Sequence, residues 1–228
     1  LGRSWESPSG RGLWFSVLLR PGLSGDRLPA LTLAAGVALA RACRQAAGVA
    51  PELKWPNDLL WRGRKLGGIL AELVAEPPGS PSVVLGVGLN VDLDRSSLPP
   101  ELRHRVASLA EAAGAPVDRA DLARQALARL DEVYRVMRES GFSALRAEWK
   151  ELAAFLGRPV RISGPDGSWT GTALDVDAEG ALLVAVSGGV RRVLAGEVSL
   201  RSVSLPFEPI DEYNDNMLYN RAIIPRRV

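Results

Sequence analysis

The sequence has little of the chemistry that marks most metal and redox sites. Its 228 residues contain one cysteine and one histidine. A disulfide within the chain is therefore impossible, and Cys43, which lies in an apolar helical stretch, is expected to be a small buried residue. His104 has no partner at the spacing of a metal site or a catalytic triad. We therefore expect no metal held by protein side chains, and a reduced, cytoplasmic setting.

The chain also lacks a long apolar run and a strong charge of either sign. Its most apolar stretch, residues 31–42, falls short of the roughly 18 residues that a membrane helix needs. Lysines and arginines number 28 against 26 aspartates and glutamates, a formal charge of +2. No membrane or nucleic-acid partner is predicted. At this length the chain can form one full core and a small second domain.

What is present is concentrated in residues 54–72, which predict a β-hairpin that carries chemistry. Pro56 cannot donate a hydrogen bond to a neighbouring strand, and the side chains of Asn57 and Asp58 favour a turn. The expected order is then a short strand, a turn and a buried strand, over residues 59–61, 62–65 and 66–74.

This hairpin offers an amide, a carboxylate, a lysine and a glycine pair. Each has an ordinary structural explanation, since Lys65 fits a solvated hairpin tip and Asn57-Asp58 fits an Asx turn. Gly67-Gly68 fits a bulge, although a glycine pair also lets a ligand approach the backbone. Only the combination favours a functional site.

The rest of the first 157 residues mixes helical and strand patterns. Helices are predicted over residues 28–47, after the capping residue Asp118, and over residues 142–156. Strands buried on both faces are predicted over residues 12–20 and 83–91. Gly86 and Gly88 in the second of these leave room for a ligand against the backbone.

After residue 158 the period changes from helical to alternating. Five short strands are expected, over residues 160–163, 169–176, 181–186, 190–194 and 198–203. Glycine-containing turns separate them. This pattern predicts a small β-barrel.

Two segments carry a family resemblance. Lys-Trp-Pro-Asn-Asp at residues 54–58 and Arg-Lys-Leu-Gly-Gly-Ile-Leu-Ala-Glu at residues 64–72 closely resemble the signature of biotin protein ligases. Residues 1–8 with 12–16 resemble the end of that family's adenylate-binding loop and the strand after it. Further matches lie at residues 86–91 and 196–201, in the family's order.

The resemblance covers residues 1–203 and implies an α+β fold. It implies a catalytic domain at residues 1–157, a mixed β-sheet with helices packed on it as in class II synthetases. An SH3-like β-barrel is expected at residues 158–204, and residues 205–228 are left without an assignment.

The resemblance also implies an activity. Biotin protein ligases use ATP and Mg²⁺ to form biotinyl-5′-AMP and then attach biotin to a lysine of a biotin carboxyl carrier protein, here that of acetyl-CoA carboxylase. Biotin ligases often form homodimers through the sheet edge of the large domain, so a homodimer is a further expectation.

The resemblance assigns roles residue by residue. The catalytic residues are Lys65, at the α-phosphate and carboxylate oxygens, and Asp58, which orients or deprotonates the acceptor amine. The nucleotide-binding residues are Arg3, Trp5, Asn57, Asn90 and Arg201. The residues expected to line the biotin pocket are Gly2, Lys65, Gly67, Gly68 and Leu70.

Alternatives stay open at this point. The chain begins at Leu1 within the expected loop, so we expect an N-terminally truncated ligase. A catalytically incompetent fragment or binding module of the same fold is the second interpretation. A lipoate ligase relative is the third, although the lysine-containing signature favours biotin.

Overall fold

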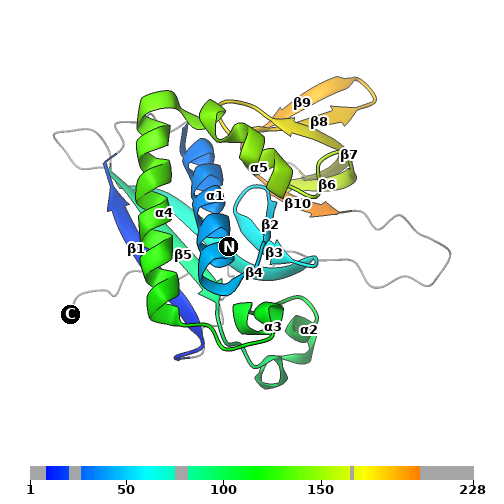
Figure 1. The fold of residues 1–228 in the computed structure, drawn as a ribbon. Helices are drawn as coiled ribbons and strands as arrows, with labels where there is room; N and C mark the ends of the chain where they lie inside the picture. The colour runs from blue at the N-terminus through cyan, green and yellow to red at the C-terminus, as the bar shows by residue number, and fades with distance from the viewer. Residues whose placement is uncertain (1–8, 21–26, 75–81, 165–166, 201–228) are drawn as a thin grey trace.

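The computed structural model describes residues 9–20, 27–74, 82–164 and 167–200, which form two five-stranded sheets (Figure 1). The first sheet contains β1 (Gly12–Leu19), β2 (Glu52–Lys54), β3 (Asp58–Trp61), β4 (Arg64–Val74) and β5 (Ser82–Asn90). Its strand order is β1-β5-β4-β3-β2. All of its described ladders are antiparallel.

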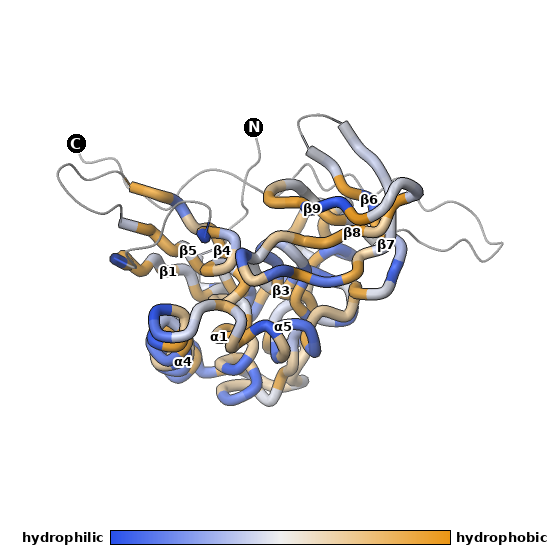
Figure 2. Tube along the Cα trace, turned by 90° about the horizontal axis from the view of Figure 1, so that it is seen from above, coloured by the Kyte–Doolittle hydropathy of each residue, from blue (hydrophilic) through white to orange (hydrophobic). Residues whose placement is uncertain are grey.

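Two long helices cover one face of this sheet (Figures 1 and 2). The helix α1 (Leu28–Ala47) is rich in alanine and lies beside α4 (Arg119–Ser140), and both helices pack on the sheet (Figure 2). Its small side chains let the layers approach closely, and a Cβ at Gly36 would lie 3.4 Å from Leu53. The α1 residues 30–40 are all buried, which explains why this stretch is the most apolar in the chain.

Local signals set the C-terminal end of α1 and the N-terminal end of α4. Gly48 ends α1 in the left-handed conformation at φ 65°, and its N–H donates to the carbonyl of Arg44. Asp118 caps α4 as predicted, because its carboxylate accepts from the N–H groups of Ala120 and Asp121.

Short elements complete the first unit and lead to the second sheet. They are η2 (Arg95–Ser97), α2 (Pro100–Arg103), α3 (Leu109–Ala113), η3 (Phe142–Ala144) and α5 (Arg146–Leu152). The second sheet contains β6 (Pro159–Gly164), β7 (Gly167–Val176), β8 (Leu182–Val186), β9 (Gly189–Val193) and β10 (Glu197–Leu200). Its order is β10-β6-β7-β8-β9, again antiparallel.

One hydrophobic core spans both units. It includes Leu39 and Val87 of the first unit and Ile162 and Val184 of the second. Cys43 belongs to this core, and burial raises the pKa of its thiol to about 12. The expectation of an inert buried cysteine is therefore confirmed. Among the described residues, no helix is long and apolar enough to cross a membrane.

The α+β class and the small all-β C-terminal unit are confirmed, but three details are corrected. The first sheet is antiparallel rather than mixed, and Lys65 forms only an isolated parallel bridge with Val106. The strand at residues 12–20 is not buried on both faces, since Leu18 is 50% exposed. The physical reason is that α1 and α4 cover only the face that carries Val17 and Leu19, and Leu18 points to the other face.

The third correction concerns the helix predicted over residues 142–156. The structure has η3 followed by α5, which ends at Leu152. Beyond it, Phe155 packs edge-on against Trp149 with ring centroids 6.1 Å apart. Residues six apart point to different sides of an α-helix, so this contact requires the chain to leave the helix.

Candidate functional site

A single row of residues crosses the first sheet on the face away from α1 and α4. The register pairs Trp14 with Gly88, Gly88 with Gly68, Gly68 with Asp58 and Asp58 with Lys54. Residues directly opposite one another share a face.

The opposite face of the sheet packs against the helices α1 and α4. Ile69, which follows Gly68, lies close enough to α1 that a Cβ at Gly36 would be 3.9 Å from its Cδ1. Gly68 and the rest of the row therefore face away from the helices, because side chains alternate along a strand.

Lys65 joins this row because of a β-bulge. Strict alternation would place Lys65 on the helix face with Gly67 and Ile69. The pairing instead shifts between Leu59 and Leu60, so that Leu66 is an extra residue in β4. The bulge turns Lys65 toward Asp58, and its Nζ lies 2.7 Å from Asp58 Oδ1.

Two lysines flank the carboxylate of Asp58. Lys54 Nζ lies 3.7 Å from Oδ2, on the other side from Lys65. The three side chains are only 7–11% exposed. Together these groups carry a formal charge of +1 in a place largely shielded from water, where an anionic ligand is favoured. The sequence contains only three lysines, and two of them are here.

The backbone of Lys65 is fixed by neighbouring segments. Its N–H donates to the carbonyl of Arg105 at 2.7 Å, and its carbonyl accepts from the N–H of Ala107 at 2.8 Å. The side-chain amide of Asn90 donates to the carbonyls of Lys65 at 3.3 Å and Ala107 at 3.1 Å. Asn90 therefore lies behind Lys65 and helps to hold it.

Asn57 also uses its amide within the protein. Its Nδ2 donates to the carbonyl of Ile69 at 2.8 Å, while the N–H of Ile69 donates to the carbonyl of Asn57 at 3.0 Å. This reciprocal pair fastens the turn before β3 to β4.

Gly88 and Gly68 lie between the two ends of the row, and Gly86 lies beside them on the same face of the sheet. Gly68, Gly86 and Gly88 have no side chains to place on this face, and we call them the glycine floor. A second row, in which Ser16 pairs with Gly86 and Gly86 with Leu70, continues it. A flat ligand on this floor would contact backbone, between Trp14 and Ser16 on one side and Asp58 and Leu70 on the other.

Close packing beside the floor explains Gly67. A Cβ at this position would lie 2.5 Å from the carbonyl oxygen of Gly88 and 2.7 Å from Leu89 Cδ2. Gly67 therefore allows close strand packing and faces the core, whereas Gly68 lies on the site face.

Trp14 and Lys54 are site residues that the sequence reasoning missed. The indole nitrogen of Trp14 is buried and has no hydrogen-bond partner among the described residues. Alternation along residues 12–19 would have placed Trp14 and Ser16 on one face. The missing information was the register that sets Trp14 beside Gly88.

The remaining predicted residues divide into two groups. Lys65, Asp58, Gly68 and Leu70 share the site face, with Asn57, Asn90 and Gly67 packed around them. Gly2, Arg3, Trp5 and Arg201 lie outside the described residues.

The described residues do not fit a protein-held metal. They contain no group of three or more histidines, cysteines, aspartates or glutamates that could hold an ion. Asp58, the carboxylate at the site, is instead paired with two lysines.

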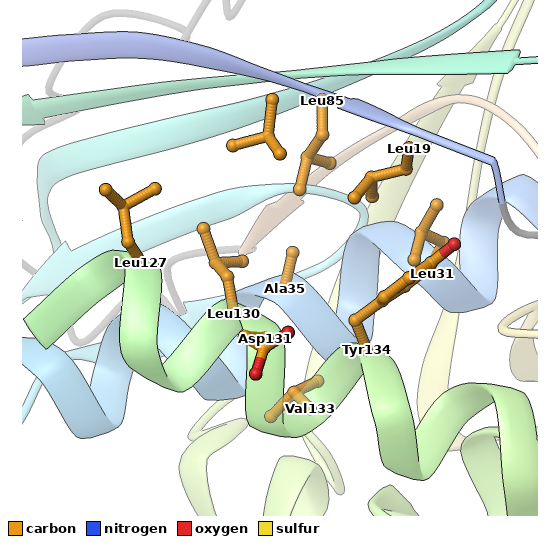
Figure 3. Close-up of a pocket in the computed structure, with 10 residues that line it drawn as sticks. Leu19, Leu31, Ala35, Leu85, Leu127, Leu130, Asp131, Val133 and Tyr134 are labelled. Carbon is orange, nitrogen blue, oxygen red and sulfur yellow. The ribbon is translucent and has the colours of Figure 1, made fainter.

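A cavity of about 240 Å³ lies on the other face of the sheet (Figure 3). Its walls come from α1, α4, β1 and β5 and are mostly apolar, including Leu31, Leu85 and Leu130. Asp131 and Tyr134 of α4 add its polar groups. None of the predicted site residues lines it.

Comparison with known families defines the class of protein. Residues 1–92 match the Biotin/lipoate A/B protein ligase family, and residues 155–201 match the Biotin protein ligase C terminal domain. These two matches indicate the class of biotin and lipoate protein ligases.

Individual relatives narrow this class. A Biotin--[acetyl-CoA-carboxylase] ligase of Paracoccus denitrificans is 33% identical over 205 residues, covering 86% of this chain and 83% of the relative. A biotin protein ligase from Aquifex aeolicus, solved in complex with biotin and ATP, is 30% identical with a TM-score of 0.76, covering 88% and 82% of the two chains. The chain belongs to the biotin protein ligase family.

A third relative is longer than this chain. The bifunctional ligase/repressor BirA of Bacillus subtilis is 36% identical over 200 residues, which are 88% of this chain. The match spans 62% of the length of that relative.

Proposed function

We propose that the chain catalyses ATP-dependent attachment of biotin to a lysine of a biotin carboxyl carrier protein through biotinyl-5′-AMP. The observation that carries this proposal is the row in which Lys54, Asp58 and Lys65 meet the glycine floor. The floor offers backbone to a flat ring, and the lysines offer positive charge beside it. Family membership and the biotin and ATP bound to the Aquifex aeolicus relative support the same function.

The lysines suit the first step. The carboxylate of biotin must approach the α-phosphate of ATP, so two anions come together and negative charge accumulates. Lys65 is proposed to stabilise that charge and then the adenylate. The ammonium group of Lys65 stabilises this charge best if it is already held in place before the substrates bind. Asp58 holds the side chain, and the contacts at Arg105 and Ala107 hold the backbone.

Asp58 is proposed to act in the second step as well. The amine of the carrier lysine, after losing its proton, attacks the carbonyl carbon of the mixed anhydride, and the bond to phosphate breaks as AMP leaves. Asp58 already holds one ammonium group at 2.7 Å. We propose that it orients the incoming amine in the same way.

Several finer roles remain proposals. Arg3, Trp5 and Arg201 are proposed nucleotide contacts, and Gly2 a biotin contact. Asn57 and Asn90 are proposed to act on the nucleotide by fixing the segments that surround it. Mg²⁺ is proposed to be carried by the phosphates of ATP, as is usual for this ion. The carrier of acetyl-CoA carboxylase is the proposed partner, and the sheet edge of the first unit is the proposed homodimer contact.

The test is biotin-dependent exchange of labelled pyrophosphate into ATP, which isolates the first half-reaction. In Lys65→Ala the exchange rate is expected to fall by about 100-fold or more, since one donor to a developing charge is lost. The control is Lys150→Ala, which removes the third lysine, on α5 and ion-paired with Asp175. Its exchange is expected to equal that of the unaltered chain.

Three results would count against the proposal. Exchange unaffected by Lys65→Ala would remove Lys65 from catalysis. Exchange supported by lipoate and not by biotin would move the chain to the lipoate branch of the class. A folded chain without exchange would favour the interpretation as a binding module.

A further inference from the structure

Trp55 links the candidate site to the C-terminal unit. It stands next to Lys54 and three residues before Asp58, and it is 0% exposed. Its indole Nε1 donates a hydrogen bond of 2.9 Å to the carbonyl of Gly180, in the turn between β7 and β8. A single buried side chain thus connects two segments that are 125 residues apart.

The accepting carbonyl sits in a tightly bonded turn, residues 177–181. The carboxylate of Asp177 accepts from the N–H groups of Glu179 at 3.1 Å and Ala181 at 2.9 Å. The carbonyl of Asp177 accepts from the N–H of Gly180. Arg192 of β9 pairs with the same carboxylate at 2.5 Å. The turn therefore holds the Gly180 carbonyl independently of Trp55.

The same turn packs against the start of α1. A Cβ at Gly180 would lie 2.5 Å from the backbone nitrogen of Ala30 and 2.8 Å from the carbonyl carbon of Pro29. Gly180 also has φ +83°. Because the backbone of the turn packs this closely against α1, the turn holds the Gly180 carbonyl at a fixed position relative to α1.

We propose that Trp55 is a positioning residue through which the C-terminal unit sets the geometry of the candidate site. The inference rests on the proposed function and deepens it. Lys54 and Asp58 flank Trp55 on the same short segment, so a displacement of the indole moves both charges relative to Lys65. The hydrogen bond from Trp55 to the carbonyl of Gly180 holds that segment in position.

The first variant is Trp55→Phe, which keeps an aromatic ring and removes the N–H. We expect the kcat of pyrophosphate exchange to fall by about tenfold, because small displacements at a charge-stabilising site are costly. The KM values for ATP and biotin are expected to change by less than about threefold. Trp149→Phe makes the same chemical change at a buried core position, 1% exposed, and is expected to lower the melting temperature without lowering kcat.

The second pair of variants approaches the bond from its other end. Gly180→Ala introduces both backbone strain and the clash with Ala30, whereas Gly157→Ala introduces similar strain at φ +78° with nothing within 4 Å. Only Gly180→Ala is expected to lower kcat. In the double variant Trp55→Phe/Gly180→Ala the two losses are expected not to multiply, because both break one contact.

Amide hydrogen exchange over residues 52–61 provides a readout independent of activity. Trp55→Phe is expected to accelerate exchange there, and Trp149→Phe is not. Unchanged protection and kcat in Trp55→Phe would overturn the inference, as would losses no greater than those of Trp149→Phe. If the unaltered chain shows no pyrophosphate exchange, the proposed function fails, and the amide exchange comparison alone decides whether Trp55 positions the segment.

Discussion

At the scale of single residues, the charges of the site are held by their neighbours. Burying a charge is costly unless it is paired and hydrogen-bonded. Lys65 meets this condition through Asp58, while its backbone is bonded on both sides by residues 105–107. Such a lysine loses little freedom when a ligand binds, which suits it to stabilise developing charge.

The substitution Gly67→Ala tests how closely β4 and β5 must pack. In Gly67→Ala the Cβ would lie 2.5 Å from the Gly88 carbonyl oxygen, so a strand must move. We expect the free energy of unfolding to fall by about 1–3 kcal/mol, the usual cost of overpacking. Urea denaturation measures the change.

The matched control for this change is Gly164→Ala. Gly164 also lies in a strand, β6, and a Cβ there would meet nothing within 4 Å. Its stability is expected to stay within about 0.5 kcal/mol. Equal losses in both variants would show that close packing is not the reason for glycine at position 67.

At the scale of elements, ion pairs fix the helices to one another. Arg41 of α1 makes a bidentate pair with Glu148 of α5, at 2.8 and 2.5 Å, and also reaches Glu132 of α4 at 3.1 Å. One guanidinium thus joins three helices. The hydrogen bond from Arg41, despite the opposing effect of burial, holds the pKa of Glu148 below its ordinary value of 4.5, and Arg44 adds to this.

The pair predicts a defined dependence of stability on pH. Because the pKa of Glu148 is lowered by folding, its contribution is complete above about pH 4.5 and is lost as the pH falls through the lowered value. Glu148→Gln is therefore expected to be less stable than the unaltered chain at neutral pH, with a difference that shrinks below pH 4.5. Thermal unfolding between pH 7 and pH 3 measures it.

Glu151→Gln is the control on the same helix, since this carboxylate is exposed. Its melting temperature is expected to equal that of the unaltered chain at every pH. A difference in melting temperature between Glu148→Gln and the unaltered chain that stays constant down to pH 3 would contradict the assignment of the lowered pKa to the Arg41 pair.

At the scale of the whole molecule, the two units share one core. Trp55 and Trp149 of the first unit belong to the same cluster of buried residues as Ile162 and Val184 of the second. Arg146 and Lys150 of α5 also pair with Asp175 of β7, at 2.5 and 2.9 Å. The C-terminal unit therefore contacts the first through both apolar and charged groups.

A shared core predicts a single cooperative unfolding transition. Neither unit can lose its packing without exposing apolar surface of the other. We expect the calorimetric and van't Hoff enthalpies to agree, and far-UV and near-UV circular dichroism to report one midpoint. Two separate transitions would show that the units are thermodynamically independent.

The sequence by itself determined most of the elements and singled out the segment on which the candidate site is built. A body rich in alanine and leucine that ends at Gly48 predicted α1, and helical period predicted α4. Alternation predicted the C-terminal strands, and the side chain of Asp118 predicted its cap. The family resemblance of residues 54–72 predicted separate catalytic roles for Lys65 and Asp58. The structure brings their charged groups to 2.7 Å. These features are local, so neighbouring residues suffice to specify them.

Only the tertiary structure decided which residues meet. A bulge at Leu66 reversed the face of Lys65, and the cross-strand register placed Trp14 and Lys54 in the row with the glycine floor. The bond from Trp55 to Gly180 joins segments distant in the chain. Register, bulges and contacts between units depend on packing free energies summed over many residues, which no short stretch of sequence contains.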